Sequence, residues 1–212
     1  MIIPIIFIIF CLLFSFSSSQ PSMFDFCVAD FSAPYGPAGY SCKNPANVTP
    51  RDFYGSGLGV PGNTANTFKI GETTVNVQQI PGLNSLGVSL SRLDVAVGGA
   101  VPLHTHPDAT EVLVVLQGSM TAGFISTNNT VYMKSLGVGD VFVFPRGLMH
   151  FQRNPGKTQS MGIAAYSSSK PNIQILDLAL FQSNLSSQQI TASTFINIPE
   201  VKRLKTLFGG SG

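Results

Sequence analysis

The sequence predicts an all-β protein, a β-barrel or β-sandwich that ends in a few short helices. Short apolar runs rich in β-forming residues begin at Val88 and recur at close spacing up to Leu176. Turn signals such as Gly98-Gly99 and Asn128-Asn129 separate the runs, which is typical of barrels and sandwiches. No helical pattern alternates with these runs, which argues against a parallel α/β sheet.

The predicted strands lie in a barrel domain at residues 86–177. They cover residues 88–97, 112–117, 120–126, 131–136, 141–144, 148–153, 161–166 and 173–176. Further turns are expected at Gly118, at 137–140 (Gly-Val-Gly-Asp) and at 145–147 (Pro-Arg-Gly).

The chain begins with the features of a secretory signal peptide. Residues 1–14 are apolar, but as a helix they would reach only about 21 Å, short of the roughly 30 Å core of a bilayer. The small residues Ser17, Ser18 and Ser19 suit cleavage near Ser19–Gln20, so residues 1–19 are predicted to be removed. No later segment is expected to span a membrane, and the mature protein is expected to be secreted.

Residues 20–85 are predicted to form an irregular N-terminal arm. Pro, Gly, Asn and Ser are frequent there, and only short extended pieces such as 74–79 are expected. Cys11 leaves with the signal peptide, so Cys27 and Cys42 are the remaining pair. An oxidising compartment predicts a Cys27–Cys42 disulfide, with two free buried thiols as the alternative.

Glycosylation is predicted at three sequons, at Asn47, Asn128 and Asn184. Asn47 and Asn128 are the better candidates, because both lie in polar turns.

Residues 178–212 are predicted to form short C-terminal helices. Pro199 suits the first turn of a helix and Gly209 suits its C-cap. The apolar stripe between them consists of Val201, Leu204, Leu207 and Phe208. A second helix is expected near 187–194 and a single turn near 178–181. The stripe must be buried either on the barrel or on a neighbouring subunit.

The composition restricts the partners of the protein. Hydrophobic residues make up 44% of the chain and charged residues only 10%, so oligomer contacts are a natural place for the excess apolar surface. The net charge of +2 is too small to indicate a nucleic-acid partner. The one basic cluster, Lys202, Arg203 and Lys205, is interpreted as a solvated helix face.

All three histidines of the chain lie in two short segments. His104 and His106 are two residues apart, so in a strand both side chains point to one face. Residues 107–109 interrupt that strand, which lets Glu111 turn toward the same point, and His150 can approach from a separate strand. Three imidazoles and a carboxylate suit Mn²⁺, Fe²⁺, Zn²⁺ or Cu²⁺ without identifying the metal.

Such a site can be catalytic without further residues. Four protein ligands in a six-coordinate shell leave two positions for water or substrate. No catalytic residue beyond the metal ligands is predicted.

Residues 98–118 and 139–154 resemble the two sequence boxes of the cupin family. The first box, G(X)5HXH(X)3–4E(X)6G, is matched by Gly98, His104, His106, Glu111 and Gly118. The second, G(X)5PXG(X)2H(X)3N, is matched by Gly139, Pro145, Gly147, His150 and Asn154. Residues 24–30 (FDFCVAD) and Cys42 are similar to the start of mature germins and germin-like proteins. The resemblance covers nearly the whole mature chain.

This resemblance implies a cupin jelly-roll barrel that holds one manganese ion with His104, His106, Glu111 and His150. It also implies a homohexamer built as a trimer of dimers, with C-terminal helices that clasp a neighbouring subunit. The implied location is the plant apoplast or cell wall. Superoxide dismutase activity, reported across the family, is the first functional hypothesis, with a role in defence or stress response.

Oxalate oxidase activity is not expected. The oxalate-degrading members of the family hold their substrate with two asparagines, and the matching positions here are Ser91 and Val101. Ser91 keeps a short polar group, but Val101 cannot donate a hydrogen bond to a dianion.

The alternative hypothesis is a non-catalytic auxin-binding receptor or structural cell-wall protein. Residues 102–107 (PLHTHP) most closely resemble the germin-like subgroup described as auxin-binding. Its ligand, an aromatic acid, would enter an apolar barrel mouth formed by Leu103, Phe142, Phe144 and Met149, although these residues are more simply explained as core. A nucleotide-sugar phosphodiesterase is a third, weaker hypothesis.

Overall fold

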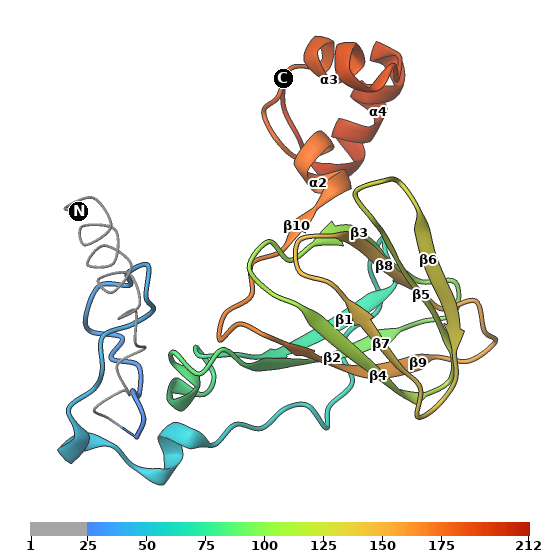
Figure 1. Cartoon of the computed structure of the whole chain (residues 1–212). Helices are drawn as coiled ribbons and strands as arrows, with labels where there is room; N and C mark the ends of the chain where they lie inside the picture. Colours follow the sequence, from blue (N-terminus) through green and yellow to red (C-terminus); the bar gives the residue numbers. More distant parts are fainter. Residues whose placement is uncertain (1–24) are drawn as a thin grey trace, which may run out of the picture.

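The computed structural model describes residues 25–212, so the predicted signal peptide at 1–19 lies outside the described residues. Within the described part, two five-stranded antiparallel sheets face each other (Figure 1). The first has the order β1-β2-β9-β4-β7, from Ile70–Val75, Ser89–Val95, Ser160–Tyr166, Glu111–Gln117 and Val141–Phe144. The second has the order β10-β3-β8-β5-β6, from Gln174–Ile175, Ala100–Thr105, Met149–Arg153, Met120–Ile125 and Val131–Leu136.

The hydrophobic core lies between the two sheets. Along β9 every second residue is buried, as expected for a strand with one face on the core. Leu113 and Val115 of β4 contribute from one sheet, and Met120 and Ala122 of β5 contribute from the other, all fully buried. The predicted all-β barrel is therefore confirmed.

All eight predicted strands are present, with ends that differ by at most two residues. Two further strands, β1 and β3, are not among the eight strands that the sequence predicts. β1 lies within the stretch assigned to the arm and pairs with β2 over its whole length, so the sheet begins at Ile70, ahead of the residues 86–177 predicted for the barrel. The sequence of β1 contains Gly71, and a glycine weakens the pattern expected of a strand. A glycine is needed at this position because an added Cβ would lie 2.5 Å from the carbonyl carbon of Gly62.

The N-terminal arm extends to one side of the barrel (Figure 1) and contains the predicted Cys27–Cys42 disulfide. Short 3-10 turns occur at η1 (Pro45–Asn47), η2 (Pro50–Phe53) and η3 (Pro81–Leu83). The amide of Ala29 donates to the carbonyl of Pro81 at 2.9 Å, which ties the disulfide region to the segment that precedes β2. The arm is otherwise irregular, as predicted.

The C-terminal helices are α2 (Leu176–Phe181), α3 (Ser187–Thr194) and α4 (Ile198–Phe208), and they stand together beyond β10 at one end of the barrel (Figure 1). Phe181, Ile190 and Val201 form their small core. Leu207, predicted on the buried stripe, is instead 53% exposed. None of the helices in residues 25–212 is long and apolar enough to cross a membrane.

Candidate metal centre

The four predicted ligand residues come from three strands and one loop. His104 on β3 and His150 on β8 are direct cross-strand partners in one sheet. His106 follows the end of β3, and Glu111 is the first residue of β4 in the opposite sheet. The break after His106 therefore carries the chain from one sheet to the other, so Glu111 faces the histidines across the barrel.

The structure brings these four side chains together in the interior. Their ligand atoms all lie within 4.8 Å of one another, a group that can hold a metal ion. The Oε2 atom of Glu111 lies 3.2 Å from His150 Nε2 and 3.3 Å from His106 Nε2. All four residues are at most 5% exposed, so their charges are shielded from solvent.

Backbone carbonyls fix the orientation of each imidazole. The Nδ1 atoms of His104, His106 and His150 lie 2.7–2.8 Å from the carbonyl oxygens of Pro102, Asn172 and Leu148. Since a carbonyl only accepts hydrogen bonds, each Nδ1 carries the hydrogen and donates it. Each Nε2 is thus directed at the centre of the cluster, as in sites where outer contacts orient histidine ligands.

The electrostatics of the cluster favour a cation at its centre. Burial, assisted by the nearby His150, lowers the pKa of His104 to about 4, so this ring is neutral at pH 7. Burial alone would raise the pKa of Glu111, but the hydrogen bonds with His106 and His150 outweigh it and lower the pKa to about 2. Burial likewise opposes protonation of His106, yet Glu111 raises its pKa overall.

These observations fit a bound metal ion. The Nε2 atoms of the neutral imidazoles and the oxygen of the Glu111 carboxylate all present lone pairs to the centre of the cluster. Their arrangement is stable when a positive charge lies between them. In the metal-free protein a proton supplies this positive charge, and a metal ion can replace the proton. The donor set contains no sulfur, because Cys27 and Cys42 are joined in the disulfide.

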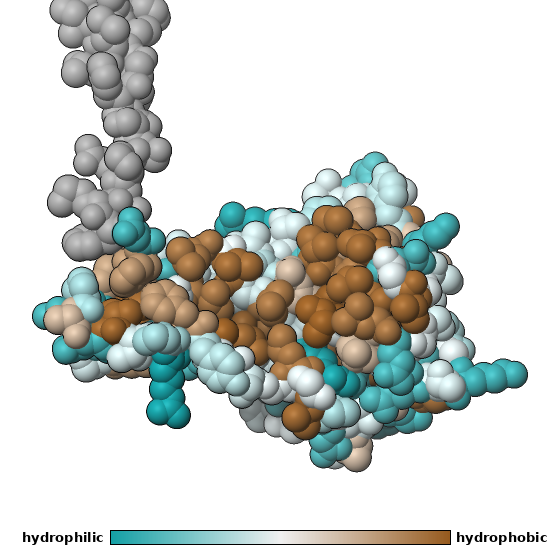
Figure 2. All heavy atoms as spheres, turned by 90° about the horizontal axis from the view of Figure 1, so that it is seen from below, coloured by the Kyte–Doolittle hydropathy of each residue, from teal (hydrophilic) through white to brown (hydrophobic). Residues whose placement is uncertain are grey.

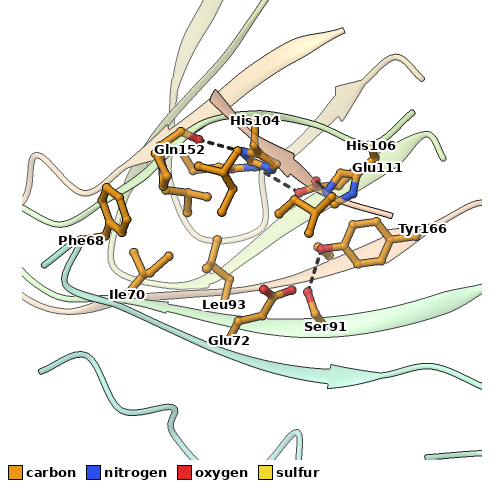
Figure 3. Close-up of a pocket in the computed structure, with 15 residues that line it drawn as sticks. Phe68, Ile70, Glu72, Ser91, Leu93, His104, His106, Glu111, Gln152 and Tyr166 are labelled. Atoms are coloured by element: carbon orange, nitrogen blue, oxygen red, sulfur yellow. Dashed lines mark hydrogen bonds and ion pairs between the residues drawn. The ribbon is translucent and has the colours of Figure 1, made fainter. Parts of the chain in front are cut away.

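A cavity of about 80 Å³ lies beside the cluster, and Figure 3 shows the side chains that line it. Apolar walls come from residues such as Ile70, Leu93 and Ile173. Ser91 and Val101, the two positions matched to the substrate asparagines of oxalate-degrading relatives, both line it.

Sequence reasoning missed three polar residues of this cavity: Glu72, Gln152 and Tyr166. Gln152 Nε2 donates to Glu111 Oε1 at 3.1 Å, and Tyr166 Oη is hydrogen-bonded to Ser91 Oγ at 2.9 Å. Burial raises the pKa of Tyr166 above its ordinary value, so this phenol stays protonated. Gln152 could have been found, because it is two residues from His150 on one strand; Glu72 had no comparable local signal.

The hypothesis of an apolar mouth is not supported, because none of Leu103, Phe142, Phe144 and Met149 lines the cavity. The simpler explanation, that such residues are core, holds for Phe142 and Phe144. Leu103 and Met149 each precede a ligand histidine in a strand, so their side chains alternate to the opposite face of the sheet. Phe144 is a core residue at 1% exposure, and Phe142 packs against the same core.

Comparison with known proteins agrees with this architecture. A family model described as Cupin matches residues 56–202. A germin-like protein of Morus alba is 52% identical over the full length of both chains. Auxin-binding protein ABP19b of Prunus persica is also 52% identical over the whole of both chains. A solved structure of recombinant oxalate oxidase in complex with glycolate superposes with a TM-score of 0.84 at 36% identity, covering 89% of this chain and 98% of that one.

Proposed function

We propose that this chain, which belongs to the cupin family and within it to the germin-like proteins, is a secreted manganese protein that dismutates superoxide in the plant apoplast or cell wall. The observation that carries the proposal is the buried cluster of His104, His106, Glu111 and His150 beside a cavity of only about 80 Å³. A role in defence or stress response would follow from the removal of superoxide.

The residues of the chain hold and shield the site. The four ligands would bind the ion, and the backbone carbonyls that hold each Nδ1 keep the three rings from turning away. Bound manganese would supply one-electron redox chemistry. The cavity is far smaller than the roughly 300–1,000 Å³ of pockets for larger ligands, which favours a diatomic substrate. Two superoxide ions and two protons give one O₂ and one H₂O₂, and solvent water can deliver the protons.

Manganese is the metal implied by the resemblance to germins. The nitrogen and oxygen donors suit it but would also accept iron, zinc or copper. Oxalate oxidase activity is not proposed, although solved oxalate oxidases share the fold. The valine side chain at position 101 offers an oxalate dianion no hydrogen bond.

Metal analysis beside a superoxide assay tests the proposal. The purified glycoprotein should contain about one manganese per subunit and should dismutate superoxide. His106→Ala should lose both the metal and the activity. The surface variant Glu200→Gln, which removes one exposed carboxylate on α4, should keep both. Manganese well below one per subunit, or undiminished activity in His106→Ala, would refute the proposal.

The alternative is a non-catalytic auxin-binding receptor or a structural cell-wall protein. It is favoured by 52% identity to a relative named as an auxin-binding protein. The small cavity argues against it, because an aromatic acid needs more space than about 80 Å³. Calorimetric titration with an auxin decides between the two: saturable, tight binding without superoxide turnover would favour the receptor.

We also propose that the protein assembles into a homohexamer, a trimer of dimers. Figure 2 shows apolar side chains gathered on one face of the molecule. Exposed apolar residues include Val112, Val141 and Val143 on the outer side of β4 and β7, and Phe195, which is 92% exposed between α3 and α4. Large exposed apolar patches mark contact surfaces. Sedimentation analysis should give six subunits; a monomer would exclude this assembly.

The protein is expected to carry glycans. Asn47, Asn128 and Asn184 are all exposed to solvent, as acceptor sites must be. Mass spectrometry of the secreted protein before and after glycosidase treatment tests each site.

A further inference from the structure

Glu72 places a second carboxylate in the cavity, in addition to the metal ligand Glu111. It lies on β1 opposite Leu93 of β2, and Leu93 also lines the cavity. Although the residue as a whole is exposed at the edge of the barrel, Figure 3 shows its carboxylate beside Ser91, below Tyr166. A ligand that approaches the metal ligands from this side must therefore pass a carboxylate.

No fixed cation compensates Glu72. Within residues 25–212, no lysine or arginine lines the cavity. Arg92 lies between Ser91 and Leu93 on β2, but its side chain points to the other face and forms an ion pair with Asp94 at 2.8 Å. Lys69, just before β1, packs beside Gly99 and does not line the cavity. The titratable groups that face Glu72 are Glu111, His106 and Tyr166.

One further polar group of the lining, the amide oxygen of Gln152, is an acceptor without a partner in the described part of the chain. Gln152 is 1% exposed, and its Nε2 is held by Glu111, which fixes the orientation of the amide. Its Oε1 atom has no hydrogen-bond partner among the described residues, so a buried acceptor is left for a donor on a ligand or water.

We propose that Glu72 is a specificity-determining residue that disfavours carboxylate ligands in the cavity relative to small neutral molecules that donate hydrogen bonds. A ligand carboxylate would lose its hydration and meet Glu72 and the Gln152 acceptor, with only the bound metal to attract it. A neutral donor such as an amide or alcohol can hydrogen-bond to either acceptor without charge repulsion.

The exclusion depends on pH. Burial raises the pKa of Glu72, and the nearby Glu111 charge raises it further, against the opposing effect of Ser91 and His106. Below this pKa the carboxyl is neutral and can itself donate a hydrogen bond, so carboxylates gain access as the pH falls. Superoxide is also an anion, so Glu72 should slow its entry without preventing it. The inference itself concerns ligand binding and holds whether or not the protein is a dismutase.

The test compares two small ligands that differ in charge, glycolate and glycolamide, by calorimetric titration of the purified, metal-containing protein. Glu72→Gln should bind glycolate at least tenfold more tightly than the wild type at pH 7.5, a change of about 1.4 kcal/mol. Binding of glycolamide should change less than twofold. As the pH is lowered, the wild type should gain glycolate affinity more steeply than the variant.

Two further variants complete the test. Glu200→Gln removes an exposed carboxylate far from the cavity and controls for the change in net charge. Glu72→Ala provides a second neutral side chain in case the glutamine forms new contacts. Metal content and thermal stability are measured for each. Equal glycolate affinity in the wild type and both Glu72 variants would overturn the proposal, as would the same pH dependence in all three proteins.

Discussion

Gln152 offers a clean test of how the protein holds its candidate metal ligands. Its Nε2 donates to Glu111 Oε1 at 3.1 Å, while the other oxygen of that carboxylate faces His106 and His150. Because Gln152 Oε1 has no partner, Gln152→Leu removes one hydrogen bond and no other, with little change in side-chain volume. Glu111 then stays buried but can turn away from the histidines.

The magnitude follows from the kind of bond that is lost. A hydrogen bond to a buried carboxylate contributes about 1.5–3 kcal/mol. If that contribution is needed to keep Glu111 in the binding orientation, metal affinity should fall by a factor of about 10 to 150. Substitution of groups that orient metal ligands commonly has effects of this size.

Competition with a chelator of known affinity measures the change. The matched control is Gln159→Leu, because Gln159 Nε2 also donates to a carboxylate, that of Asp94 at 3.3 Å, but outside the metal cluster. Gln159→Leu should leave metal affinity unchanged. The reasoning is refuted if Gln152→Leu binds the metal as tightly as the wild type, or if both variants weaken binding equally.

Three other predictions concern stability. His104 is 3% exposed with a pKa lowered from 6.5 to about 4, so its contribution to the unfolding free energy of the metal-free protein should fall by about 3 kcal/mol between pH 6.5 and pH 4; denaturant titrations in which His104→Gln keeps the same pH dependence as the wild type would contradict this. Gly71→Ala should destabilise the fold by about 1–3 kcal/mol in the same assay, because the new methyl group meets the backbone of Gly62. Replacing Cys27 and Cys42 with serine should cost about 3 kcal/mol, since the disulfide closes a loop with a sequence separation of 15; an unchanged melting temperature would count against it.

The ligand set was predictable because its signals are local. His104 and His106 share one strand face, and Glu111 and His150 stand at fixed spacings from tight turns. The disulfide was predictable because only two cysteines lie outside the predicted signal peptide. In contrast, Leu103 and Met149 do not line the cavity, because each is next to a ligand histidine in its strand and successive strand residues face opposite sides of the sheet.

The sequence by itself determined the β-rich architecture, the ligand types and the C-terminal helices, since short-range periodicity and turn residues encode them. Only the tertiary structure decided that Glu72, Gln152 and Tyr166 share a cavity with the candidate metal ligands. They come from β1, β8 and β9, far apart along the chain, and their positions depend on strand register. A shift of register by one residue would turn each side chain to the other face, and no local pattern in the sequence fixes the pairing of strands so distant.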